Sequence, residues 1–104
     1  MDEAGEFLSM LGGKWTMVNE APRRIQKGVR TKNFVAAMDL LNAWAVVAEE
    51  EGHHPDFHLT GWNNVMVSVH THHSRGLTEN DFILAAKLDQ VLNEKMELLS
   101  KKQP

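Results

Sequence analysis

Residues 32–71, KNFVAAMDLLNAWAVVAEEEGHHPDFHLTGWNNVMVSVHT, decide the fold because the spacing of their apolar residues changes part-way along. Over residues 32–51 apolar residues recur at steps of three or four, which is the period of an amphipathic helix. Gly52 follows directly and is expected to end this helix. The residues expected to form its buried stripe are Phe34, Ala37, Met38, Leu41, Ala45 and Ala48.

The second half of this stretch has the period of a β-strand. Valines occupy every second position from residue 65 to residue 69, so they share one face of an extended chain. Residues 56–60 and 65–71 are therefore expected to form two strands, joined by a turn at 61–64. The helix thus leads directly into a hairpin.

The flanking sequence supplies the remaining elements. We expect a short helix over 2–11, strands at 15–19 and 24–30 with a turn at 20–22 between them, and a final helix from the capping-box residues Thr78 and Asp81 to about Ser100. The order helix, strand, strand, helix, strand, strand, helix predicts an α+β fold with a four-stranded antiparallel sheet and the helices packed on one face. No linker divides residues 1–104, so one domain is expected. The last helix is longer than such a small sheet needs, which indicates either self-association or a helix that frays beyond Glu97.

The composition excludes several classes of chemistry and partner. The 104 residues include no cysteine, so there is no disulfide, thiolate metal site or thiol nucleophile. The 11 basic and 14 acidic residues are interspersed, which argues against a nucleic-acid partner. No apolar run approaches the roughly 20 residues of a membrane span. The acidic N-terminus is unlike a signal peptide, so a cytoplasmic protein is expected, with a nuclear fraction allowed.

Histidine is the component that points to catalysis. His53 and His54 follow the predicted helix, and His70, His72 and His73 lie at the end of the last predicted strand. Both groups bracket the predicted hairpin and are expected to approach one another. The residues alone leave three interpretations open, namely solvated loop histidines, a zinc or copper site, and acid–base catalysis by paired imidazoles. The spacing lacks the helical His-x-x-x-His pair that favours a metal.

A longer pattern includes these histidines. Three, six, nine and eight residues separate its successive parts, which are Glu49, His53-His54-Pro55, Trp62, His72 and Asp81. In this pattern, and throughout residues 52–86, the chain resembles the pterin-4a-carbinolamine dehydratase family. Gly13-Lys14-Trp15 resembles more weakly the start of the family's first strand. The chain departs from the family at Gly52, where many members carry an acidic residue, and at 29–31, where Phe-x-Phe is common.

The resemblance implies an activity. Members remove water from 4a-hydroxytetrahydrobiopterin to give quinonoid dihydropterin, which recycles the cofactor of aromatic amino-acid hydroxylases. The pterin is the substrate, and no metal or organic cofactor is implied. By resemblance, His53 and His72 are the acid and base, and His54 binds and orients the pterin.

The resemblance also implies which residues surround the substrate. These are Pro55, Thr71, His73, Ser74, Glu49, Trp15 and Asp81. Glu49 is expected either to orient an imidazole or to be solvated. Trp15, together with Trp62, is expected either to wall a flat heterocycle or to lie in the core. Asp81 is expected to act first as a helix cap. Three histidines, His58, His70 and His73, fall outside the core pattern.

The family also implies partners. Its members form homodimers or homotetramers, and some animal members bind a homeodomain transcription factor and stabilise its dimer. A non-enzymatic binding module with such a protein partner is therefore the alternative function. No direct binding to nucleic acid or membrane is expected.

Overall fold

The computed structural model describes residues 11, 15–20, 23–70 and 77–104. Its elements, in chain order, are β1 (Thr16–Val18), β2 (Arg24–Arg30), α2 (Phe34–Glu51), β3 (Asp56–Thr60), β4 (Asn64–Val69), α3 (Glu79–Glu94) and the 3-10 helix η1 (Met96–Leu98). The predicted α+β class is confirmed, and β2 and β3 have the predicted bounds. The helix expected over 2–11 lies outside the described residues except for Leu11, and so do the turn residues 21–22.

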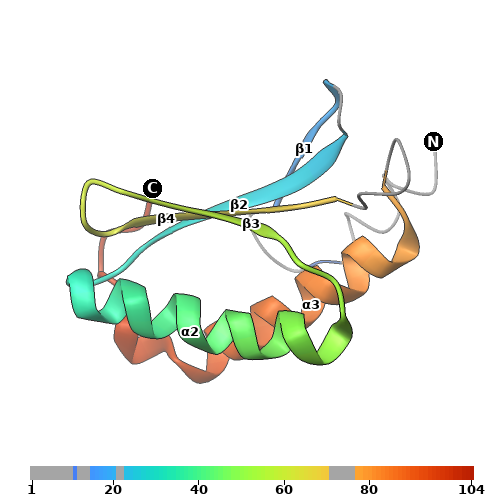
Figure 1. The fold of residues 1–104 in the computed structure, drawn as a ribbon. Helices are drawn as coiled ribbons and strands as arrows, with labels where there is room; N and C mark the ends of the chain where they lie inside the picture. Colours follow the sequence, from blue (N-terminus) through green and yellow to red (C-terminus); the bar gives the residue numbers. More distant parts are fainter. Residues whose placement is uncertain (1–10, 12–14, 21–22, 71–76) are drawn as a thin grey trace.

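The four strands form one antiparallel sheet in the order β1-β2-β4-β3 (Figure 1). Strands β1 and β2 form one predicted hairpin, and β3 and β4 form the other. The pairing of β2 with β4 joins the hairpins, with Ile25 opposite Val69 and Val29 opposite Val65. Because directly opposite residues point to the same face, this register gathers the apolar side chains of the two middle strands on one side.

Helices α2 and α3 both lie against this apolar face, as predicted (Figure 1). The three valines of β4 are at most 2% exposed and share one core cluster with Trp44 of α2 and Leu88 of α3. Nε1 of Trp44 donates to the backbone oxygen of Leu88 at 3.1 Å, which satisfies the buried indole where the helices meet. This contact fixes the position of α2 relative to α3.

The buried face of α2 differs from the predicted stripe. Asn33 caps the helix, since its Oδ1 accepts the N–H of Ala36 at 2.8 Å. Phe34 and Met38 were expected inside but are 53% and 42% exposed. The prediction was wrong because α2 is apolar around most of its circumference, so periodicity does not select one face. The buried residues are Ala36, Ala37, Leu40, Trp44 and Ala48. No described helix, including α2, has the length and apolar character of a membrane span.

The C-terminal helix is shorter than predicted. Helix α3 ends at Glu94, and after η1 the chain forms a β-bridge between Leu99 and Thr31. Two backbone hydrogen bonds of 2.9 Å also join segment 98–100 to segment 30–32. Leu98 and Leu99 pack against the core. Leu98 and Leu99 are therefore partly buried within the chain and do not extend a free helical stripe, and Met96 is the apolar residue of this segment that is exposed, at 57%.

Gln103 fastens this C-terminal segment to β2. Its Oε1 accepts the N–H of Arg30 at 2.8 Å, and its Nε2 lies 2.7 Å from the backbone oxygens of both Arg30 and Ser100. We expect Gln103→Ala to lower the free energy of unfolding by about 1–3 kcal/mol, measured by urea denaturation. Lys101→Ala, at an exposed neighbouring position, is the control and should change it by less than about 0.5 kcal/mol. Equal stabilities of the two variants would contradict this role for Gln103.

Candidate active site

His53 lies where three segments of the chain meet. It follows the C-terminus of α2, and the pairing of Asp56 with Ser68 brings the start of β3 beside the end of β4. The first turn of α3 approaches from the other side, with Nε2 of His53 2.6 Å from Oδ1 of Asp81. The His53 side chain is 17% exposed and that of Asp81 is 0% exposed. The structure therefore pairs a partly exposed imidazole with a fully buried carboxyl group.

The end of α2 fixes the backbone of His53. Gly52 is in the left-handed region, with a φ of 64°. The N–H of His53 donates to the oxygen of Ala48, and the N–H of Gly52 donates to that of Glu49, both at 3.2 Å. These two bonds form a Schellman motif, which ends the helix at a defined angle. Pro55 then restricts the chain before it enters β3.

Asp81 is held in place within the first turn of α3. Its Oδ2 accepts the N–H of Thr78 at 2.8 Å, so the predicted capping box is present. The first turn of a helix also favours negative charge, because the helix dipole is positive there. The expectation that Asp81 is a cap is confirmed, and the contact with His53 gives the same side chain a second role.

The contact with Asp81 determines which ring nitrogen of His53 is available. A carboxylate has only acceptors, so a hydrogen bond to Oδ1 of Asp81 requires the proton on Nε2 of His53. In the neutral ring Nδ1 then carries the lone pair. A histidine in this state accepts a proton at Nδ1 and can return it, which is the behaviour of a general base and then a general acid.

Glu49 contacts His54, the second histidine of the pair. Nε2 of His54 is 2.7 Å from Oε1 of Glu49, and the two side chains are 59% and 79% exposed. Exposed pairs of this kind contribute about 0–1 kcal/mol, so this contact orients the His54 ring more than it stabilises the fold. Both expectations for Glu49 agree with this geometry, since its carboxylate contacts an imidazole and is largely exposed to solvent.

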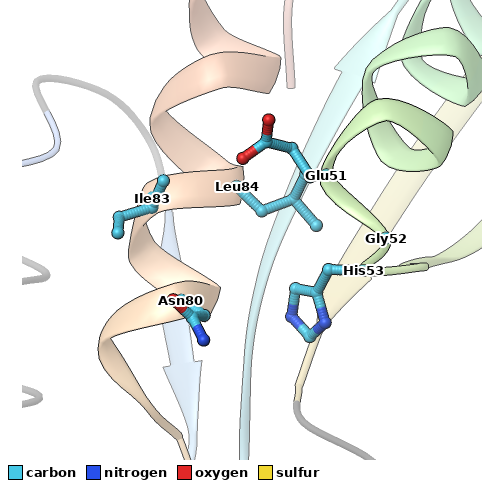
Figure 2. A pocket seen from close by; sticks show the side chains of 6 residues that line it. All are labelled: Glu51, Gly52, His53, Asn80, Ile83 and Leu84. Atoms are coloured by element: carbon cyan, nitrogen blue, oxygen red, sulfur yellow. The ribbon is translucent and has the colours of Figure 1, made fainter.

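A cavity of about 200 Å³ lies beside His53, between the end of α2 and the first turns of α3. Figure 2 shows His53 across the cavity from Asn80. Lys87 of α3 forms an ion pair with Glu51 at 2.8 Å, which links the two helices at this point. The lining residues are Glu51, Gly52, His53, Asn80, Ile83 and Leu84.

The three α3 residues of the cavity were missed by the sequence analysis. Asn80, Ile83 and Leu84 are spaced by three and then one, which places them on one side of a helix that starts at the capping box. That spacing was the available signal. The spacing alone does not show that this side of α3 faces the end of α2 and lines a cavity.

Neither of the two tryptophans that were expected to wall a heterocycle lines this cavity. Trp15 is 6% exposed in the core cluster, and its Nε1 donates to Oδ2 of Asp89 at 2.9 Å. Trp62 lies in the turn between β3 and β4 and is 58% exposed. The five residues of β3, about 16 Å of extended chain, separate this turn from the end of the sheet near His53. Trp15 thus belongs to the core and Trp62 to the distant turn.

Four of the predicted site residues lie outside the described residues, namely Thr71, His72, His73 and Ser74. The second catalytic histidine therefore remains a prediction. His70, after the end of β4, has its Nδ1 3.9 Å from Oδ2 of Asp56, and His58 is exposed on β3. Across residues 15–20, 23–70 and 77–104, no three histidine, aspartate or glutamate side chains gather as a set that could hold a metal ion.

Comparison with known proteins places the chain in a family. The family model described as pterin 4 alpha carbinolamine dehydratase matches residues 1–91. The chain belongs to this family. The family's relatives are named for a dehydratase, which is a hydro-lyase, so the family places this chain among the enzymes that eliminate water.

Individual relatives agree with the family assignment. Pterin-4-alpha-carbinolamine dehydratase 2, mitochondrial, of Arabidopsis thaliana is 44% identical over 100 residues, which cover 95% of this chain and 52% of that protein. A protein of Alkaliphilus metalliredigens, named as a candidate dehydratase of the same kind, is 37% identical over 89% of this chain and 81% of its own length. The chain thus spans about half of the plant relative and most of the bacterial one.

A solved structure shares the fold. The crystal structure titled transcriptional coactivator/pterin dehydratase, from Brucella melitensis, matches with a TM-score of 0.74 and 30% identity. The match covers 88% of this chain and 96% of that chain.

The left-handed conformation at Gly52 gives a test of how His53 is held. A Cβ at Gly52 would meet no atom within 4 Å, so the cost of Gly52→Ala comes from its φ of 64° alone. We expect this variant to lower the free energy of unfolding by about 1 kcal/mol and to reduce activity by displacing His53. Gly28→Ala is the control, because Gly28 has no positive φ and its Cβ would lie 3.9 Å from the nearest atom. Unchanged stability and activity in Gly52→Ala would show that the Schellman motif does not position His53.

Proposed function

We propose that this chain dehydrates 4a-hydroxytetrahydrobiopterin to quinonoid dihydropterin by histidine acid–base catalysis, and so recycles the cofactor of aromatic amino-acid hydroxylases. The family supports dehydration of a pterin carbinolamine. The observation that carries the proposal is the 2.6 Å contact between His53 and buried Asp81 at the wall of an open cavity. An oriented imidazole beside a cavity is what acid–base catalysis requires.

The reaction needs two proton transfers and no change of oxidation state. One group donates a proton to the C4a hydroxyl, and the C4a–O bond breaks to release water. A second group accepts the proton of N5, whose electron pair forms the C4a=N5 bond. The protein groups end with their protonation states exchanged, and solvent restores them. Imidazole side chains can donate and accept protons near neutral pH, and two of them suffice for these two transfers. We therefore propose that the chain uses no metal or organic cofactor.

We propose His53 and His72 as the two proton-transfer groups. Since Nε2 of His53 is held by Asp81, Nδ1 is the atom through which His53 would exchange a proton with the substrate. Asp81 is then a positioning residue, because it acts through His53. His54, oriented by Glu49, is proposed to bind the pterin, with Pro55, Thr71, His73 and Ser74 around it.

A stopped-flow assay with 4a-hydroxytetrahydrobiopterin tests this proposal. Wild-type protein should dehydrate the substrate faster than the spontaneous reaction, and His53→Ala should lower the enzymatic rate by about 10²- to 10⁴-fold. The fold should survive this change because the side chain is partly exposed. His58→Ala, which removes an exposed histidine from β3, is the matched control and should keep the wild-type rate.

Two results would contradict the proposal in different ways. A wild-type rate no higher than the spontaneous rate would refute the dehydratase activity. Full activity in His53→Ala would refute the assignment of the site. Asp81→Asn adds a separate readout. Without the carboxylate, His53 is no longer held with its proton on Nε2, so kcat should fall more than KM changes. Thermal unfolding of the same variant measures how much stability is lost at the helix cap.

A binding role is the second candidate function. The Brucella structure is titled a transcriptional coactivator as well as a pterin dehydratase. Helix α2 exposes Val35, Met38 and Val46 along one side, with exposed fractions of 66%, 42% and 58%. We propose that this apolar side packs against further copies of the chain in a homodimer or homotetramer, or against a transcription-factor dimer. His53→Ala separates the functions, because it removes the dehydration chemistry and leaves this surface intact.

A further inference from the structure

We propose that the cavity between α2 and α3 receives the substituent at C6 of the pterin and so determines which pterins the enzyme accepts. This inference rests on the proposed dehydration and concerns the same site. It assigns a specificity-determining role to Asn80 and Ile83 of α3, two residues outside the histidine pattern.

The size of the cavity fits part of a substrate better than the whole. Sites that enclose a complete small ligand usually measure about 300–1,000 Å³. This cavity measures about 200 Å³. A three-carbon chain with two hydroxyl groups fits in this space together with one or two water molecules, each of which takes about 30 Å³ in the liquid.

The chemistry of the lining fits a short hydroxylated alkyl chain. Ile83 and Leu84 form the apolar part of the lining. Leu84 is 1% exposed and belongs to the core cluster, and Ile83 is 41% exposed. Across residues 15–20, 23–70 and 77–104, no hydrogen bond holds the side-chain amide of Asn80, which can both donate and accept. Glu51 is already paired with Lys87 at 2.8 Å. The pyrimidine edge of a pterin needs several polar partners at once, and the carboxylate in the lining is already paired. A chain of carbons with hydroxyl groups can instead pack on Ile83 and Leu84 and hydrogen-bond to Asn80.

The covalent structure of the pterin connects this cavity to the reacting atoms. C6 is bonded to N5, which loses the proton, and N5 is bonded to C4a, which loses the hydroxyl group. A histidine nitrogen that exchanges either proton lies within about 3 Å of the atom concerned. The first atom of the C6 substituent is therefore only two or three bonds away from N5 or C4a. Because His53 is itself part of the cavity wall, a substituent that leaves the ring beside His53 enters the cavity.

The test compares two substrates that differ only at C6. One carbinolamine carries the dihydroxypropyl chain and the other carries a methyl group, and the measured quantity is the ratio of their kcat/KM values. Asn80→Ala should lower this ratio about 5- to 10-fold, because only the dihydroxypropyl chain has a hydrogen bond to lose. Ile83→Trp should lower it at least as much by filling the cavity. Asn93→Ala, at an exposed position on the same helix, is the matched control and should leave the ratio unchanged.

A binding measurement gives the same comparison without turnover. Calorimetric titration with 7,8-dihydrobiopterin and with its 6-methyl analogue should show the same change in the ratio of dissociation constants. Asn80 is exposed and Ile83 is 41% exposed, so both variants should unfold near the wild-type temperature. Unchanged ratios in both folded variants would overturn the role of the cavity. Absence of turnover of either substrate by wild type would instead refute the proposed dehydration, and the titration would still report on the C6 substituent.

Discussion

The hydrogen bond between Nε2 of His53 and Oδ1 of Asp81 is the contact on which the candidate site depends. Asp81 is fully buried, and one of its oxygens accepts the backbone N–H of Thr78 while the other meets His53. Removing the His53 side chain would take one hydrogen bond from this buried carboxyl group, at a cost of about 1–3 kcal/mol. The same carboxyl group therefore completes the start of α3 and selects the tautomer of His53. Stability and chemistry are coupled at this residue.

The rest of the fold serves to bring this pair together. Asp81 lies 28 positions after His53, and the β3–β4 hairpin between them returns the chain to the end of the sheet from which it left. The packing of Trp44 against Leu88 holds α2 and α3 side by side, and Gly52 ends α2 where His53 faces α3. The cavity lies in the same place, and Gly52, which has no side chain, forms part of its wall.

The strands and the capping box could be predicted because each depends on neighbouring residues. Apolar residues at every second position, followed by turn residues, predict a hairpin. The spacing from Thr78 to Asp81 predicts the capping box. The buried face of α2 could not be predicted, because that helix is apolar on nearly all sides. The end of α3 was missed for a related reason, since Leu98 and Leu99 continue the apolar spacing although they pair with another part of the chain. The contact of His53 with Asp81 depends on tertiary packing, which no local spacing shows.

The control of the His53 tautomer by Asp81 is tested most directly by long-range ¹H–¹⁵N correlation spectroscopy of protein labelled with ¹⁵N-histidine. The spectrum should be recorded at a pH where imidazole is neutral, with Asp81→Asn as the comparison. The structure predicts that His53 carries its proton on Nε2 and has an unprotonated Nδ1 in wild type, and that Asp81→Asn changes this pattern. A wild-type spectrum with the proton on Nδ1, or one identical to that of Asp81→Asn, would contradict it.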